Sequence, residues 1–70
     1  MVKYTILHDG CVLYTLQSND PQTESNMFNM MLKLSDESTG VFSLFRIEID
    51  PETGREKHTQ VATAKDGIEI

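Results

Sequence analysis

The sequence predicts an α+β fold of order ββαββ, in which a four-stranded antiparallel sheet packs on one amphipathic helix. Segments near both ends of the chain alternate and are rich in β-branched residues, as strands are. Turns containing glycine join these segments into hairpins. The central residues 24–38 contain no Val, Ile or Thr and follow a helical period. A chain of 70 residues has room for one core, so residues 1–70 are expected to form a single αβ domain.

The first hairpin is predicted over residues 2–18. Asp9-Gly10 favours a type I′ turn, because that turn needs positive φ at both central positions. A two-residue loop sets His8 opposite Cys11 and Ile6 opposite Leu13. In this register both faces are apolar: one carries Val2, Tyr4, Ile6 and Leu13, and the other carries Leu7, Val12, Tyr14 and Leu16.

The helix is predicted to follow Asp20-Pro21, where Asp20 caps the free amides and Pro21 takes the first helical position. At about 100° per residue, the apolar side chains of this segment fill an arc of roughly 200°. A strand over residues 24–36 is the alternative and would give an all-β meander. The helix is favoured because the strand leaves Met27 and Met31 on its polar side. Gly40 is expected to end the helix or to form a hairpin turn.

The second hairpin is predicted over residues 41–65. Its first strand has an apolar face made of the odd positions Val41, Phe45, Ile47 and Ile49. Pro51 and Gly54 turn the chain back. If Asp50 faces Arg55, Glu48 faces Lys57 in a favourable cross-strand charge pair. Another Asp-Gly turn precedes a possible short fifth strand at the end of the chain.

Composition and charge bear on nucleic-acid binding, membrane contact and cellular compartment. The net charge is −5 and the six basic residues are dispersed. Direct nucleic-acid binding is disfavoured, because phosphate contacts need a concentrated basic patch. The first ten residues do not have the pattern of a signal peptide, and no stretch has the length of a membrane span. Cys11 is the single cysteine, which fits a reducing compartment. We therefore expect a cytoplasmic protein without membrane contact.

His8, Asp9 and Cys11 form the one cluster of reactive side chains. Residues flanking a two-residue turn have Cβ atoms about 4.5–5.5 Å apart, so His8 is within reach of the Cys11 sulfur. A small-molecule binder or minimal thiol enzyme using Cys11 and His8 is therefore the alternative function. A structural role is favoured, because the turn already explains Asp9 and a hairpin tip offers no pocket. With His58, the chain has too few ligands for a zinc pattern. We expect no catalytic residue, no metal, no cofactor and no enzymatic activity.

The chain carries more apolar surface than one helix can cover, and such an excess usually marks an interface. The predicted partner interface consists of Met27, Phe28, Met30, Met31, Leu32, Leu7, Val12 and Tyr14. The predicted function is a small intracellular protein–protein interaction module, either a homodimer or a subunit of a complex. It would act as a stoichiometric regulator or inhibitor of a protein partner, such as a host protein. A phage or mobile-element origin would suit such a compact acidic chain.

Overall fold

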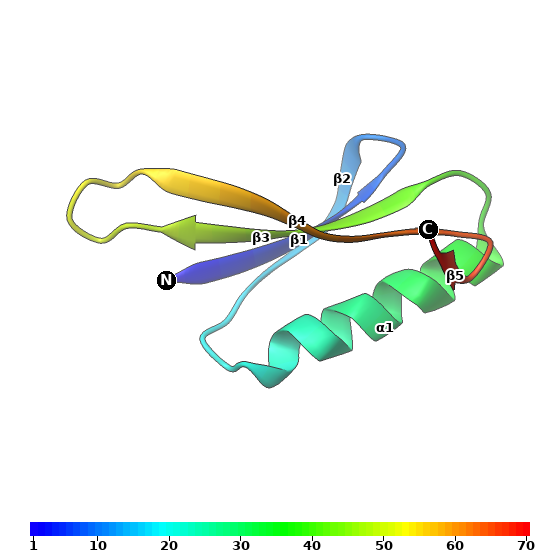
Figure 1. Cartoon of the computed structure of the whole chain (residues 1–70), viewed down its shortest axis with the longest axis horizontal. Helices are drawn as coiled ribbons and strands as arrows, with labels where there is room; N and C mark the ends of the chain where they lie inside the picture. The colour runs from blue at the N-terminus through cyan, green and yellow to red at the C-terminus, as the bar shows by residue number, and fades with distance from the viewer.

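The computed structural model describes residues 1–70 and shows a five-stranded antiparallel sheet packed against one helix (Figure 1). The elements are β1 (Val2–His8), β2 (Cys11–Gln17), α1 (Gln22–Glu37), β3 (Phe42–Ile49), β4 (Glu56–Lys65) and β5 (Ile68–Glu69). Their order in the sheet is β2-β1-β3-β4-β5. The predicted α+β fold and ββαββ order are confirmed, including the short fifth strand. The helix, and not the alternative strand, occupies the central segment.

The hairpin turns follow their sequence signals. Asp9 and Gly10 have φ angles of 51° and 85°, as a type I′ turn requires between β1 and β2. Asp66 and Gly67 repeat this conformation between β4 and β5, with φ angles of 55° and 80°. The predicted turn chemistry is therefore confirmed at both Asp-Gly pairs.

Helix α1 begins at the predicted Asp20-Pro21 signal, but Gly40 is not the residue that ends it. The Gln22 amide donates to Oδ1 of Asp20 over 2.9 Å, and Pro21 already has helical angles (φ −61°, ψ −22°). At the other end, Ser38 is extended (φ −136°, ψ 160°), so the helix is over before Gly40 is reached. Gly40, with a φ of +99°, instead bends the connection into β3.

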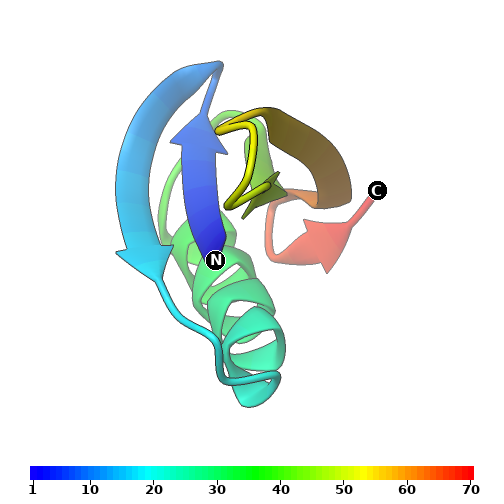
Figure 2. The ribbon, with the colours of Figure 1, turned by 90° about the vertical axis from the view of Figure 1, so that its left-hand side faces the viewer.

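The core lies between α1 and one face of the sheet, and Figure 2 shows the helix on that side alone. Tyr4 and Ile6 of β1, Phe42 and Leu44 of β3, and Ala62 and Ala64 of β4 meet Met27 and Met31 of α1 there. Burial of one large apolar side chain contributes about 1.5–3 kcal/mol. Helix α1 is not long and apolar enough to cross a membrane.

A bulge in β2 changes the predicted register of the first hairpin. Leu7 pairs with Val12 as expected, but Ile6 pairs with Tyr14, so Leu13 has no partner residue. Because side chains alternate between faces, this one extra residue moves Tyr14 and Leu16 to the face of Ile6. The predicted grouping of Tyr14 and Leu16 with Leu7 was therefore wrong, as was the pairing of Ile6 with Leu13.

The second hairpin has the predicted register, and its first strand has two apolar faces. Glu48 pairs with Lys57 as predicted. However, the core is formed by Phe42 and Leu44 at even positions of β3. The odd positions Phe45 and Ile47 therefore lie on the face opposite α1. Strand β3 is apolar on both faces, and α1 covers one of them.

Candidate functional site

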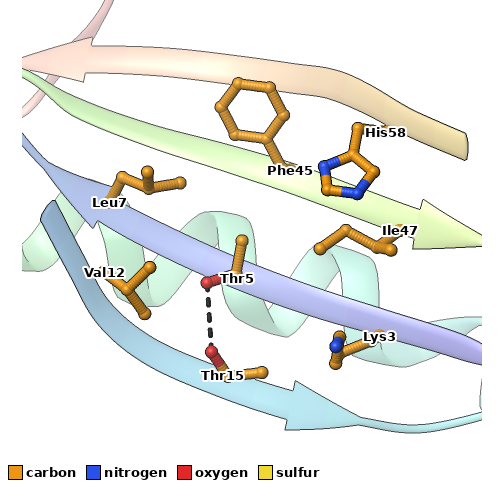
Figure 3. Close-up of a pocket in the computed structure, with 8 residues that line it drawn as sticks. All are labelled: Lys3, Thr5, Leu7, Val12, Thr15, Phe45, Ile47 and His58. Carbon is orange, nitrogen blue, oxygen red and sulfur yellow. Dashed lines mark hydrogen bonds between the residues drawn. The ribbon is translucent and has the colours of Figure 1, made fainter. Parts of the chain in front are cut away.

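The face of the sheet opposite α1 carries a hollow of about 310 Å³, which we call the open-face groove. Strands β1 to β4 all contribute to it. Its lining residues are Lys3, Thr5, Leu7, Val12, Thr15, Phe45, Ile47 and His58 (Figure 3).

One end of the open-face groove is apolar. Leu7 and Val12 are cross-strand neighbours beside the first turn, and Phe45 follows on β3, the strand next to β1, where it lies opposite Thr5 (Figure 3). Between the ends, the hydroxyls of Thr5 and Thr15 hydrogen-bond to each other over 3.1 Å. This bond satisfies both side chains within the sheet and fixes β2 against β1 on this face.

The other end of the groove is polar. Lys3 and His58 are the cross-strand neighbours of Ile47 on its two sides, and Ile47 is 7% exposed between them. The His58 Nε2 lies 3.0 Å from Oε1 of Glu56. This hydrogen bond, assisted by the charge of Lys3, holds the pKa of Glu56 below its ordinary value of 4.5. The groove thus offers apolar contact at one end and cationic or donor groups at the other.

The second exposed apolar area is the outer strand β2, which we call the β2 edge (Cys11–Gln17). All seven of its residues are exposed. Its large side chains remain open to solvent: Val12 is 67% exposed, Leu13 50%, Tyr14 41% and Leu16 38%. Helix α1 contacts β1, β3, β4 and β5 but not β2. Nothing in the chain therefore covers the β2 edge.

The structure places the predicted interface residues in four different environments. Met27 and Met31 are 1% and 0% exposed in the core, so they offer no surface to a partner. Part of the broad apolar arc of the helix is therefore buried in the core and is not available to a partner. Partly buried Phe28 and Leu32 pack against this core, and Met30 is 39% exposed. The remaining three residues lie elsewhere: Leu7 and Val12 line the groove, and Tyr14 belongs to the β2 edge.

Of the groove residues that the interface prediction did not include, two are apolar: Phe45 and Ile47. They were predicted to lie on an apolar face of strand β3, but that face was not assigned to the partner interface. The signal was present in the sequence, since Phe42 and Leu44 make the even positions apolar as well. A strand that is apolar on both faces needs cover on both.

His8 and Cys11 do not form a hydrogen-bonded pair of side chains. The two residues are cross-strand partners as predicted, but no hydrogen bond links them. The His8 ring stacks on Phe42 with centroids 4.3 Å apart. Its Nε2 lies 2.6 Å from the Thr39 carbonyl oxygen, which accepts, so Nε2 carries the proton. The imidazole is thus oriented by β3 and the connection before it, while Cys11 is exposed.

No group of three or more His, Cys, Asp or Glu side chains is arranged to hold a metal ion. Comparison with protein-family models, curated proteins and solved structures finds no match for this chain.

Proposed function

We propose that this chain is a protein–protein interaction module that binds a protein partner through the open-face groove. It acts as a homodimer or as a subunit of a complex, and regulates or inhibits its partner stoichiometrically. The observation that supports this most directly is the two-sided apolar character of β3. Phe42 and Leu44 bury themselves against α1, whereas Phe45 faces a groove that no element of the chain covers.

The groove fits an apolar side chain of a partner better than an extended polar ligand. Leu7 and Val12 form its apolar end, and Phe45 extends this apolar lining towards the middle of the groove, opposite Thr5. Burying one leucine- or phenylalanine-sized side chain there would contribute about 1.5–3 kcal/mol. Aromatic residues at the centre of an interface often carry most of the binding energy, and Phe45 is the aromatic residue of this groove.

The net charge favours a basic partner, and the single cysteine favours a reducing compartment. The net charge of −5 speeds encounter with a partner whose surface is basic. We place the module in the cytoplasm, because a single exposed cysteine fits a reducing environment. This placement is consistent with the absence of a helix that could span a membrane.

Affinity capture from the native host, read by mass spectrometry, tests this function with two variants. Phe45→Asp places a charge in the apolar lining of the groove, and Thr53→Asp places the same charge in the exposed loop between β3 and β4. We expect the wild-type chain and Thr53→Asp to retain one protein at a fixed stoichiometry. Phe45→Asp should retain at least tenfold less while keeping the circular dichroism of the folded chain. Equal capture by all three chains, or no stoichiometric protein with the wild type, would refute the proposal.

A further inference from the structure

The β2 edge is a long free strand edge without the usual protection against pairing. In natural proteins, charged residues, proline or short length prevent edge strands from pairing with other chains. Strand β2 has seven residues and contains no Lys, Arg, Asp, Glu or Pro. The opposite edge, β5, has two residues. Strand β5 pairs only with the end of β4, at Ala64 and Lys65, and the free remainder of the β4 edge carries the charged residues Glu56 and Lys57. The β2 edge has no such protection, and its single irregularity is the bulge at Leu13.

The hydrogen-bond pattern shows which backbone groups of β2 are free. The Ser18 amide donates to the Val2 carbonyl over 3.0 Å, so these two residues form a hydrogen-bonded pair. In antiparallel sheets such pairs alternate with pairs whose backbone groups point outward. Thr15 and Gln17, at odd distances from Ser18, therefore direct their N–H and C=O groups away from β1. These groups are available to a strand placed beside β2.

We propose that the strand beside β2 is β2 of a second copy, paired antiparallel with the two-fold axis at Thr15. This proposal deepens the proposed function, on which it rests, by naming the partner at this edge. In this register the two Thr15 residues face each other and exchange both backbone hydrogen bonds. Gln17 lies opposite Leu13 of the second copy, and Tyr14 lies opposite Leu16 of the second copy.

The side chains fit the register with the two-fold axis at Thr15 and do not fit the register with the axis at Tyr14. Tyr14 and Leu16 lie on the same face, so each covers the other across the axis in a non-hydrogen-bonded pair, where side chains approach most closely. An axis at Tyr14 would instead set Leu16 opposite Val12. The bulge has placed those two residues on opposite faces, so that register fails.

A second copy suits this edge for two further reasons. Each chain carries a net charge of −5, yet the β2 edge has no charged residue, so the copies meet where repulsion is least. Helix α1 does not extend beneath β2, which leaves room for the Tyr14 and Leu16 side chains of both copies. The product is a continuous ten-stranded sheet with both helices on one side.

Disulfide trapping tests the register. In a Cys11→Ser background, Thr15→Cys sets two thiols at the axis, with Cα atoms about 5.5 Å apart, as a disulfide requires. Val12→Cys is the matched control: it is 67% exposed, but six residues of offset keep its Cα atoms roughly 20 Å apart. We expect Thr15→Cys to form covalent dimers at least tenfold faster on mild oxidation. Equal rates in the two variants would overturn the register.

Sedimentation of the wild-type chain, followed to about 1 mM because small interfaces are weak, tests the dimer itself. Leu16→Lys should weaken self-association at least tenfold. Ile68→Lys adds the same charge at the other edge, where Ile68 is 66% exposed, and should leave the dimer intact. A wild-type monomer throughout would refute the β2 dimer. If that monomer still captured a protein through Phe45, the proposed function would stand. A dimer without such capture would refute binding through the open-face groove and leave the β2 dimer in place.

Discussion

Gly40 lies against the first turn, in the connection before β3. Its φ is +99°, and a Cβ built there would lie 2.5 Å from Oδ2 of Asp9 and 2.8 Å from Nε2 of His8. The Asp9 carboxylate cannot move freely, because its Oδ1 accepts a hydrogen bond from the Val41 amide over 2.9 Å. We predict that Gly40→Ala lowers the free energy of unfolding by about 2–3 kcal/mol, measured by urea denaturation.

Gly10→Ala is the control for this prediction. Gly10 also has a positive φ of 85°, but a Cβ there meets nothing within 4 Å. The control therefore has the backbone strain without the collision. Equal losses in the two variants would show that the contact between Gly40 and the first turn does not constrain the chain.

The raised pKa of Tyr4 predicts how the stability of the fold changes at alkaline pH. Burial, followed by the negative charge of Glu24, raises the pKa of Tyr4 above its ordinary value of 10.0. The unfolded chain therefore loses this proton first. The contribution of Tyr4 to stability is complete below pH 10 and is lost as pH rises through the folded-state pKa. In Tyr14→Phe, Tyr4 is the sole tyrosine, so its ultraviolet titration should have a midpoint above 10.0 when folded and a lower one in denaturant. A folded midpoint at or below 10.0 would contradict this assignment.

Among the elements, α1 and the β4–β5 turn are joined by one buried hydroxyl. Ser35 is 0% exposed; its Oγ donates to the Leu32 carbonyl over 2.8 Å and accepts from the Gly67 amide over 2.9 Å. Ser35→Ala removes the partner of that amide. We predict a loss of about 1–3 kcal/mol in the free energy of unfolding. Ser25→Ala, an exposed serine of the same helix, should change it by about 0.5 kcal/mol or less. A similar change in both would mean that the bond to Gly67 contributes little.

The elements could be predicted from the sequence because each has a local cause. Asp20-Pro21 starts the helix and Asp9-Gly10 sets the first turn, and both act within four residues. The bulges at Leu13 and Val61 could not be predicted in this way, because they depend on how two whole strands fit each other.

For the site, the excess of apolar surface was visible in the sequence. Its location was not, because assigning Phe45 to a face required the structure.

At the scale of the molecule, one helix stabilises a sheet that has two apolar faces. The core consists of eight buried residues, all on the α1 side, and a chain of this size has about 3–5 kcal/mol of net stability. Loss of one large core side chain therefore threatens the whole fold. The opposite face contributes to binding in our proposal, so a similar loss there should leave the chain folded.

Phe42 and Phe45 separate these two roles, since they lie on the same strand but on opposite faces. Phe42 is 1% exposed beneath α1, and Phe42→Ala should cost about 3–5 kcal/mol, which is enough to unfold the chain at room temperature. Phe45 is half-buried in the open-face groove, where solvent can fill the space that its ring leaves. We predict that Phe45→Ala remains folded and loses at most about 1.5 kcal/mol, measured by circular dichroism during urea denaturation. If Phe45→Ala unfolds as Phe42→Ala does, the open face is a second core and no longer supports a binding surface.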